Sequence, residues 1–217
     1  AAQAQPISGF YVGAGAGVNF TQSVDVSATG PVVLDSRSGT ADFDLGYVGV
    51  VSLGWGFGNG VRAEVEFGFR KNEAEEVTGL LNGPATSGGN LRSWQFMVNG
   101  LYDFDLGPGS FFTPYVGLGI GAVAYDFKGV RRVQTAAPND QALLSGSAWT
   151  FGAQAILGAA VPLPSILPGL ALTAEYRFMG VVPSDLDIQS VRTGVTNTGK
   201  FDADYYNHSL LLGVRYA

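Results

Sequence analysis

The stretch from Phe112 to Phe127 most constrains how this chain can fold, because its side chains alternate between two kinds. The even positions from 112 to 124 are all apolar, with Val116, Leu118 and Ile120 at the centre, whereas the odd positions are mostly glycine between two tyrosines. A period of two predicts a β-strand whose two faces meet different surroundings. A strand this long with one unbroken apolar face needs a large apolar partner, which is either a protein core or a lipid bilayer.

The composition also points away from a helical protein. Of the 217 residues, 46% are hydrophobic and 14% are charged, whereas about 25% are charged in a typical soluble domain. The chain has 32 glycines and 14 phenylalanines, and no run of apolar residues reaches the roughly 18 needed for a transmembrane helix. The absence of cysteine excludes a disulfide framework and any cysteine-based metal or redox site. A net charge of −6 argues against nucleic acid as a partner.

The same alternation recurs along the whole chain and predicts about eight strands. It is cleanest at 61–70, where charged residues alternate with apolar ones, and Asn59-Gly60 just before it is a strong signal of a tight hairpin. The predicted strands are residues 8–20, 42–55, 61–70, 91–104, 112–127, 147–160, 170–182 and 205–216. Their connections alternate between long polar loops, at 21–41, 71–90, 128–146 and 183–204, and short turns, at 57–60, 105–110 and 161–169.

Alternation alone does not say whether the apolar faces point inward, as in a soluble lipocalin-like barrel, or outward into lipid. Three features favour lipid: all long connections fall at one rim, the non-apolar faces are rich in glycine, and aromatic residues stand at the ends of the apolar rows. These aromatic residues are Phe10, Phe20, Phe43, Trp55, Trp94, Phe104, Trp149, Phe178, Tyr206 and Tyr216. The strands are also long enough to cross a bilayer at a tilt.

A sheet in lipid can have no free edge, because every backbone N–H and C=O needs a partner there. The first predicted strand must therefore pair with the last, and both termini must lie at the rim of the short turns. We expect an all-β, closed, antiparallel up-and-down transmembrane β-barrel. It would form a single domain over residues 1–217, with residues 1–7 as a short tail.

Four segments carry a resemblance to a known family: GFYVGAGAGVNF (9–20), TPYVGLGIGAVAY (113–125), LTAEYRF (172–178) and NHSLLLGVRYA (207–217). Together they resemble the eight-stranded bacterial outer-membrane barrels, which include the OmpA transmembrane domain and the surface-antigen and opacity-type porin-like proteins. The resemblance implies the outer membrane, long loops outside, and short turns with the tail in the periplasm. The small residues of AAQAQP at 1–6 separately indicate a mature N-terminus left after signal-peptide cleavage. Many OmpA-type proteins continue into a peptidoglycan-binding domain, so a chain ending at Ala217 is either a stand-alone barrel or a truncated product.

The rows opposite the apolar ones supply the candidate site. They place a charge cluster in the half of the lumen nearer the short turns, made of Arg62, Glu64, Glu66, Glu175, Arg177 and Arg215. Because an eight-stranded lumen only just holds side chains, this cluster is either a structural plug of ion pairs or a gated polar path for water or small ions. We expect two glycine rows to leave room for it, namely Gly13, Gly15 and Gly17 with Gly117, Gly119 and Gly121. We expect lipid contact at Val116, Leu118, Ile120, Leu210, Leu212 and Val214.

Other motifs have simpler interpretations. The glycine rows superficially resemble a dinucleotide-binding motif, but they lie inside strands rather than between a strand and a helix. The acidic residues near the last loop either bind a cation or are solvated charges, and they are Asp185, Asp187, Asp202 and Asp204. His208 lies on an apolar row. With one histidine and no Ser/His/Asp set, we expect no catalytic, metal or cofactor site.

The sequence thus predicts an outer-membrane barrel with a structural or surface role and at most a narrow pore. Its partners would be the lipid bilayer and outer-membrane lipids, and the chain would be a monomer or weak oligomer. One alternative is a soluble barrel that binds a small apolar ligand. Another is an adhesin or receptor whose loops contact cell-envelope or extracellular partners. Gel mobility before and after boiling separates a membrane barrel from a soluble one.

Overall fold

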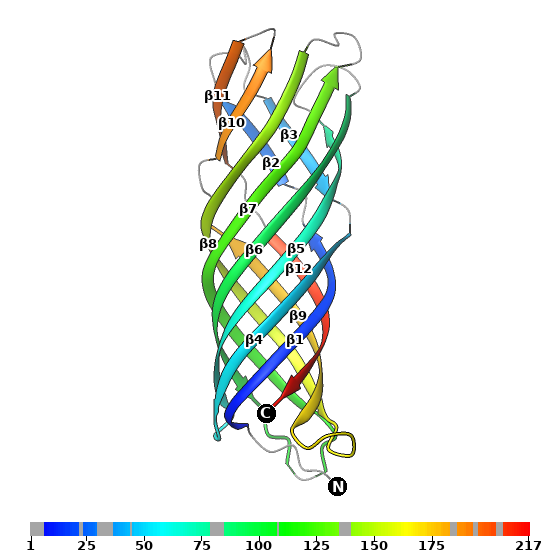
Figure 1. Ribbon diagram of the computed structural model, residues 1–217, viewed down its shortest axis with the longest axis vertical. Coiled ribbons are helices and arrows are strands. Elements are labelled where there is room, and N and C mark those ends of the chain that lie inside the picture. The colour runs from blue at the N-terminus through cyan, green and yellow to red at the C-terminus, as the bar shows by residue number, and fades with distance from the viewer. Residues whose placement is uncertain are drawn as a thin grey trace.

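The computed structural model places most of the chain in one barrel (Figure 1). The backbone is described over residues 7–21, 24–29, 37–43, 45–78, 85–107, 109–134, 140–182, 186–192, 195–202 and 206–217. Side chains are described over residues 7–20, 45–72, 92–107, 109–124, 149–182 and 206–217. No helix in this part of the chain is long and apolar enough to cross a membrane.

Eight strands close on themselves through antiparallel pairs. They are β1 (Ser8–Thr21), β4 (Gly46–Phe57), β5 (Val61–Thr78), β6 (Ala85–Asp103), β7 (Thr113–Gln134), β8 (Asp140–Pro162), β9 (Leu170–Val181) and β12 (Tyr206–Tyr216). The first strand pairs with the last, so that Gly15 faces Gly213, and the other strands follow in order around the ring. The closed barrel predicted from the alternating pattern is confirmed.

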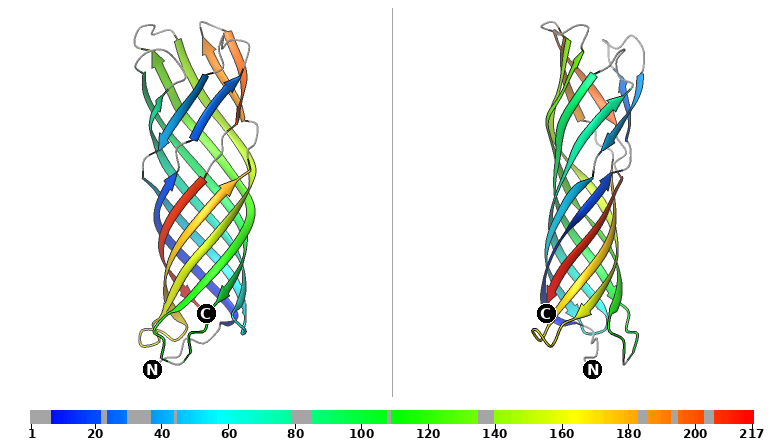
Figure 2. Two further views of the ribbon diagram at one scale, coloured as in Figure 1. Left: turned by 180° about the vertical axis from the view of Figure 1, so that it is seen from behind. Right: turned by 90° about the vertical axis from the view of Figure 1, so that its right-hand side faces the viewer.

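Both ends of the described chain lie at the rim of the short turns (Figures 1 and 2). The N–H of Gly58 in the first turn donates to the carbonyl of Ile7 at 2.9 Å, and the N–H of Ala217 donates to the carbonyl of Gly169 in the last turn at 3.1 Å. Gly58 and Gly60 have φ angles of 77° and 90°, a region that favours glycine. The predicted hairpin turn therefore forms where the Asn-Gly pair indicates.

The four long connections are not loops throughout, and here the prediction from sequence was wrong. The strands β5 to β8 continue well beyond their predicted ends, and four further strands are present: β2 (Val24–Thr29), β3 (Arg37–Phe43), β10 (Leu186–Arg192) and β11 (Val195–Asp202). These four pair with one another and with β5 and β8, so a second ring of strands continues the barrel upward (Figure 2).

The error has a physical origin in the polarity of these segments. Ser, Thr, Asn and Gly occupy many positions of β3, β10 and β11, and the alternation of Val24, Val26 and Ala28 in β2 spans only six residues. No long apolar face with a period of two therefore marks these segments as strands. Backbone pairing still supports a strand where both faces are polar. One consequence concerns Phe43, which was expected at the start of the second transmembrane strand but belongs to β3 instead.

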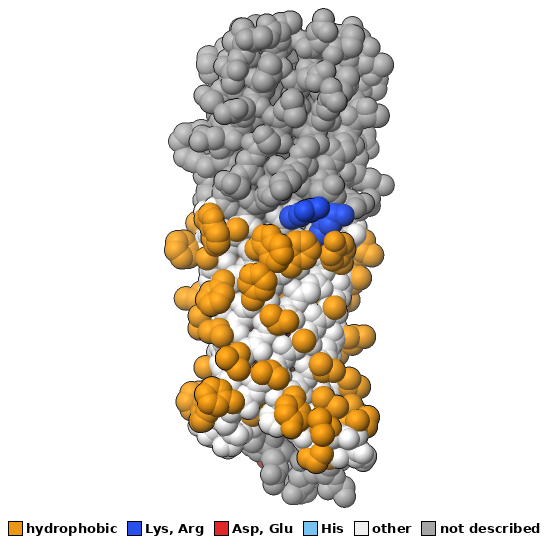
Figure 3. Space-filling model, in the orientation of Figure 1, with side chains coloured by type: hydrophobic (Ala, Val, Ile, Leu, Met, Phe, Trp, Pro, Cys, Tyr) orange, Lys and Arg blue, Asp and Glu red, His pale blue; other side chains and the backbone are white. Residues whose placement is uncertain are grey.

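The outward and inward faces differ sharply in chemistry. Leu118, Ile120 and Leu212 are each more than 70% exposed, whereas Arg62 and Glu66 are 2% and 1% exposed. The surface shows hydrophobic side chains around the lower barrel, with large ones gathered toward its two ends (Figure 3). Aromatic pairs mark these ends, with Phe10 against Trp55 at the lower end and Phe69 against Trp94 at the upper end. The barrel is therefore polar inside and apolar outside.

Candidate functional site in the barrel interior

Strand β5 supplies the longest row of charged side chains to the interior. Because every second residue of a strand points to the same face, Arg62, Glu64, Glu66 and Arg70 all point inward, and all four are buried. The residues between them are apolar and face outward. Gly68 continues the inward row, and its position is filled by the side chain of Gln95 on β6.

The lowest layer of the interior is centred on Arg62. Its guanidinium binds both carboxylate oxygens of Asp103 on β6, with Nε–O distances of 3.0 and 2.9 Å and an Nη2–Oδ1 distance of 2.8 Å. Its third nitrogen, Nη1, donates to the hydroxyl of Tyr11 on β1 at 3.0 Å. That hydroxyl donates in turn to Glu64 at 2.9 Å. A bidentate pair of this kind fixes the orientation of both groups.

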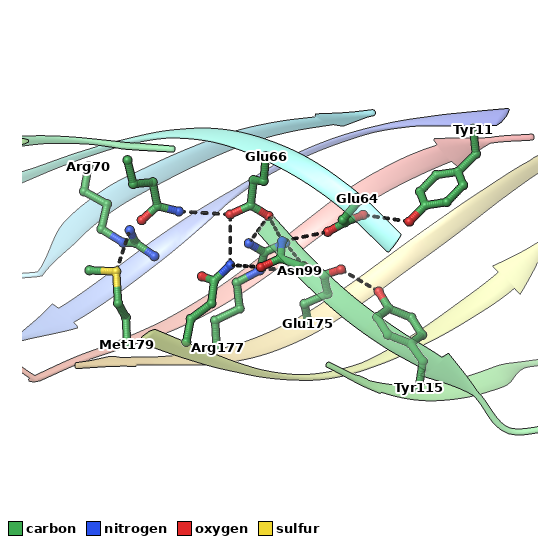
Figure 4. A network of polar contacts seen from close by, with 11 residues as sticks. Tyr11, Glu64, Glu66, Arg70, Asn99, Tyr115, Glu175, Arg177 and Met179 are labelled. Atoms are coloured by element: carbon green, nitrogen blue, oxygen red, sulfur yellow. Dashed lines mark hydrogen bonds and ion pairs between the residues drawn. The ribbon is translucent and has the colours of Figure 1, made fainter. Parts of the chain in front are cut away.

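Glu66 occupies the centre of the middle layer (Figure 4). Its carboxylate accepts hydrogen bonds from Gln95 at 3.0 Å and from Gln154 at 3.3 Å, and it forms a short ion pair with Arg177. Asn99 links this layer to the one below, because its amide donates to Glu64 at 3.0 Å and accepts from Gln154 at 2.8 Å. The carboxylates of β5 are thereby connected to β6, β8 and β9.

Glu175 and Tyr115 complete the network on the opposite wall. Arg177 donates to Glu175 through Nε at 2.8 Å and through Nη2 at 2.6 Å. The hydroxyl of Tyr115 on β7 donates to the other oxygen of Glu175 at 2.6 Å. Arg177 therefore bridges two carboxylates, Glu66 and Glu175, and this satisfies most of its donors in the buried lumen.

Arg215 lies at the edge of this network. Its guanidinium carbon is 5.9 Å from the centre of the Tyr115 ring, within range of a cation–π contact. Its Nη1 atom is buried without a hydrogen-bond partner. A cavity of about 30 Å³ lies beside it, with Tyr11, Glu64 and Glu175 among the lining residues. This volume suits one or two water molecules.

The interior charges balance in number. Among the described inward-facing residues there are four arginines, Arg62, Arg70, Arg177 and Arg215, and four acids, Glu64, Glu66, Asp103 and Glu175. Arg70 lies above the network, where its Nη1 contacts the sulfur of Met179 at 3.5 Å. Buried charges are tolerated when they are paired and hydrogen-bonded, and the ion pairs of Arg62 with Asp103 and of Arg177 with Glu66 and Glu175 meet that condition.

The glycine rows face the interior, where Gly13 and Gly15 line the small cavity beside the charge cluster, but the atoms nearest to the rows belong to other residues. A Cβ atom added to Gly117 would meet the side chain of Leu101, and one added to Gly119 would meet the side chain of Asn99. A Cβ atom added to Gly121 would meet the carbonyl of Phe96 and the backbone and side chain of Met97. On β1, the nearest atoms are those of Ser52 at Gly13, of Leu212, Val50 and Leu211 at Gly15, and of the Leu210 backbone at Gly17. The space is therefore taken by close strand packing and uncharged side chains.

Two other glycines make room for the interior tyrosines. A Cβ on Gly54 would overlap the ring of Tyr11, and a Cβ on Gly158 would overlap the ring of Tyr115. Each tyrosine lies flat against a glycine of the neighbouring strand and directs its hydroxyl to a carboxylate, Glu64 or Glu175. The sequence pattern did not single out this pairing, because it depends on register between strands.

The comparisons with known proteins agree with this inverted barrel. The model of the family described as "Outer membrane protein beta-barrel domain" matches residues 1–217. The chain belongs to this family. A curated relative named "Outer membrane protein", from Gluconacetobacter diazotrophicus, is 35% identical over 229 residues, which cover 100% of this chain and 59% of the relative. The chain thus spans somewhat more than half the length of that protein.

Solved outer-membrane proteins share the fold. OprG from Pseudomonas aeruginosa has a TM-score of 0.64 at 16% identity, with 98% of each chain covered. Neisserial surface protein A has a TM-score of 0.51 at 19% identity, with 96% of this chain and 97% of that chain covered. The protease OmpT from Escherichia coli has a TM-score of 0.56 at 8% identity, with 96% of each chain covered. At these identities the likeness extends to the fold alone.

This member of the outer-membrane barrel family is therefore located in the outer membrane, in contact with its lipid bilayer. The alternative of a soluble lipocalin-like barrel is not favoured, because such a barrel would carry its apolar faces inside. The six residues expected to contact lipid all lie on the outward face and are 40–74% exposed: Val116, Leu118, Ile120, Leu210, Leu212 and Val214.

Several members of the interior network were not singled out from the sequence of this outer-membrane barrel. They are Tyr11, Arg70, Gln95, Asn99, Asp103, Tyr115 and Gln154. All lie at alternate positions on the inward face of their strands, as the predicted cluster does, and this alternation is the signal that identifies them. The amides and tyrosines were missed because an uncharged residue in a strand does not stand out as a charge does. Arg70 and Asp103 are charged, and their place on the inward face was enough to include them in the cluster.

The remaining candidate residues give no second site within the part of the chain whose side chains the structure describes. The four acidic residues proposed as a cation site near the last loop have side chains outside the described residues. His208 accepts or donates a hydrogen bond with the Tyr176 hydroxyl at 2.7 Å on the outward face, beside Phe178 and Tyr206. Among the described residues, no group of His, Cys, Asp or Glu could hold a metal ion.

Proposed function

We propose that this chain is a structural, surface-exposed outer-membrane barrel, one domain over residues 1–217, whose lumen is closed by its charged network. The observation that carries the proposal is the middle layer of the interior. There Glu66 on β5 binds side chains from β6, β8 and β9 across the lumen. The cavity of about 30 Å³ below this layer is far too small for a solute path.

The second ring of strands supports a role at the cell surface. It carries the barrel beyond the upper aromatic residues, away from the rim that holds the short turns and both ends (Figures 1 and 2). In our proposal the short turns face the periplasm, as the family resemblance implies. The upper ring then presents the long connections outside the bilayer, where cell-envelope or extracellular partners would bind.

Electrical recordings test the closed lumen. The purified full chain, inserted into a planar lipid bilayer, is expected to give no discrete current steps, because in our proposal Glu66 and Arg177 close the lumen. An eight-stranded barrel filled by side chains is the geometry that predicts this result. Steady single-channel openings of the wild-type chain would contradict the proposal.

A narrow gated path for water or small ions is the second candidate, because the small cavity beside Glu64 and Arg215, although too small for larger solutes, is large enough for water molecules. If the network is a gate, Glu64→Ala should remove the acceptor of Tyr11 and Asn99 and raise single-channel conductance. The comparison is made with Ser52→Ala, which also lines the cavity but lies outside the charge network. Unchanged currents in Glu64→Ala would exclude gating at this layer.

A further inference from the structure

A groove of about 800 Å³ lies on the lipid-facing surface, outside the interior network. Its lining combines small residues of β1 and β4 with bulky neighbours: Ala14, Ala16 and Gly49 with Phe67, Phe69 and Leu212. Gly49 leaves the groove open, because a Cβ atom there would meet nothing within 4 Å. Since the surrounding surface is apolar, the groove offers a recess to a hydrocarbon chain.

A cation stands at the upper end of this groove. Phe69 pairs with Gly49, and Lys71 pairs with Tyr47 one step further up the same two strands. Two residues of a strand cover about 7 Å, so Lys71 follows Phe69 directly on the outward face. The Lys71 ammonium lies 5.9 Å from the centre of the Tyr47 ring, which places this charge beside the upper aromatic residues.

Arg92 on β6 is a second cation at the same level. Its side chain is exposed, and its backbone is the strand partner of Lys71 on β5. Figure 3 shows Lys and Arg side chains immediately above the upper band of hydrophobic side chains. At this level the bilayer presents its headgroups.

We propose that the groove and the Lys71–Arg92 pair together bind a phosphate-bearing lipid. One acyl chain would lie in the recess at Gly49, between Phe67, Phe69 and Leu212, and the phosphate would meet the two cations above it. The arrangement matches that of a lipid, because the apolar groove lies at the level of the acyl chains and the two cations lie at the level of the headgroups. A basic residue near a membrane surface attracts anionic lipid, and a long basic side chain reaches that level readily.

Native mass spectrometry of the full chain in an uncharged detergent tests this site. The probes are diphosphoryl lipid A, an uncharged diacylglycerol and inorganic phosphate. We expect the wild type to retain lipid A in preference to diacylglycerol, and inorganic phosphate at equal concentration not to displace it. With each cation contributing as basic residues do at a membrane surface, Lys71→Gln with Arg92→Gln should weaken lipid A binding about ten- to thirtyfold.

A matched pair of glycine variants tests the groove itself. Gly49→Leu fills the recess and should weaken binding about two- to fivefold, because the acyl chain would lose some five carbon–carbon contacts with the recess. Gly100→Leu is the control, because Gly100 is also outward and open but lies away from the groove on β6. Heat-dependent gel mobility confirms that each variant has folded.

Four results would overturn the proposal. They are a wild type that retains no lipid A, unchanged binding in the double variant, equal losses in Gly49→Leu and Gly100→Leu, and diacylglycerol binding as tight as lipid A. A fifth result, displacement of lipid A by inorganic phosphate, would instead show a site for free phosphate and would overturn the assignment to a lipid.

Discussion

Glu66 shows what a single side chain does in this interior. It is 1% exposed, accepts hydrogen bonds from Gln95 and Gln154, and forms an ion pair with Arg177. These three partners lie on three different strands. The charge of a buried carboxylate is tolerated only because these partners replace water. Its loss would leave a guanidinium and two amides without their common acceptor.

We therefore expect Glu66→Ala to destabilise the barrel by about 3–5 kcal/mol, the usual cost of removing one partner of a buried ion pair. Glu66→Gln should cost less, because it keeps the side-chain volume and one acceptor oxygen. Unfolding by urea in lipid vesicles, followed by tryptophan fluorescence, measures both. A loss below about 1 kcal/mol in Glu66→Ala, the range of an exposed pair, would show that the network contributes little to stability.

The interior tyrosines allow a matched test at the same scale. Gly54→Ala and Gly158→Ala place a methyl group against the rings of Tyr11 and Tyr115, and such overpacking costs about 1–3 kcal/mol. Gly100→Ala, where a Cβ meets nothing within 4 Å, should stay within about 0.5 kcal/mol of the wild type. Equal effects at all three positions in the same unfolding assay would argue that strand propensity, not ring packing, decides the outcome.

The sequence predicts part of the site because alternate residues of a strand share a face. Arg62, Glu64 and Glu66 share one face of a strand, and a period of two is enough to place them on the side opposite the apolar row. Their partners cannot be found in this way. Which of Asp103, Asn99 or Gln95 meets each charge depends on the register between β5 and β6, and register is set by the turn and by the whole ring rather than by either strand alone.

At the scale of the element, the polar strands are the instructive case. β10 and β11 pair from Leu186 with Phe201 to Arg192 with Val195, although their sequences read as a loop. An apolar row reveals a strand only where one face is buried or in lipid. Transmembrane segments such as β7 meet that condition, whereas strands beyond the apolar band do not, and the sequence therefore predicts the lower ring but not the upper one.

The absence of cysteine makes the upper ring testable by cross-linking. Gln189 pairs with Thr198 in β10 and β11, and Cα atoms of such partners lie within the range that a disulfide bridges. We expect Gln189→Cys with Thr198→Cys to cross-link on mild oxidation, as seen by non-reducing mass mapping. The control pairs Gln189→Cys with Asn197→Cys, one residue out of register. Equal yields for the two pairs would show that this segment has no fixed register.

At the scale of the whole molecule, the barrel is inverted relative to a soluble protein. Its outer face carries residues such as Leu118, Ile120 and Leu212 in the open, and its charges are inside. Composition and alternation together predict this arrangement, because a low charge content and aromatic residues at row ends fit a bilayer better than water. The pairing of β1 with β12 follows from the need to leave no free edge in lipid.

A charge placed on this outer face should report its depth in the membrane. Ile120→Arg, in the middle of β7, is expected to destabilise the barrel in lipid vesicles by about 2–4 kcal/mol, whereas Leu106→Arg, in a rim turn, should cost about 0–1 kcal/mol. Urea unfolding and the fraction of heat-shifted, folded protein on gels measure the difference. A similar cost at both positions would place Ile120 away from the bilayer centre.

The interior network also has a consequence for how the barrel is assembled. A hydrogen bond joins Tyr11 of β1 to Glu64 of β5, and an ion pair joins Arg177 of β9 to Glu66 of β5, so the complete network exists only when strands from both halves of the chain are in place. An open sheet in lipid would hold these same groups against hydrocarbon without partners. The side chains of this network thus penalise every unclosed intermediate, and insertion and closure are expected to occur as one event.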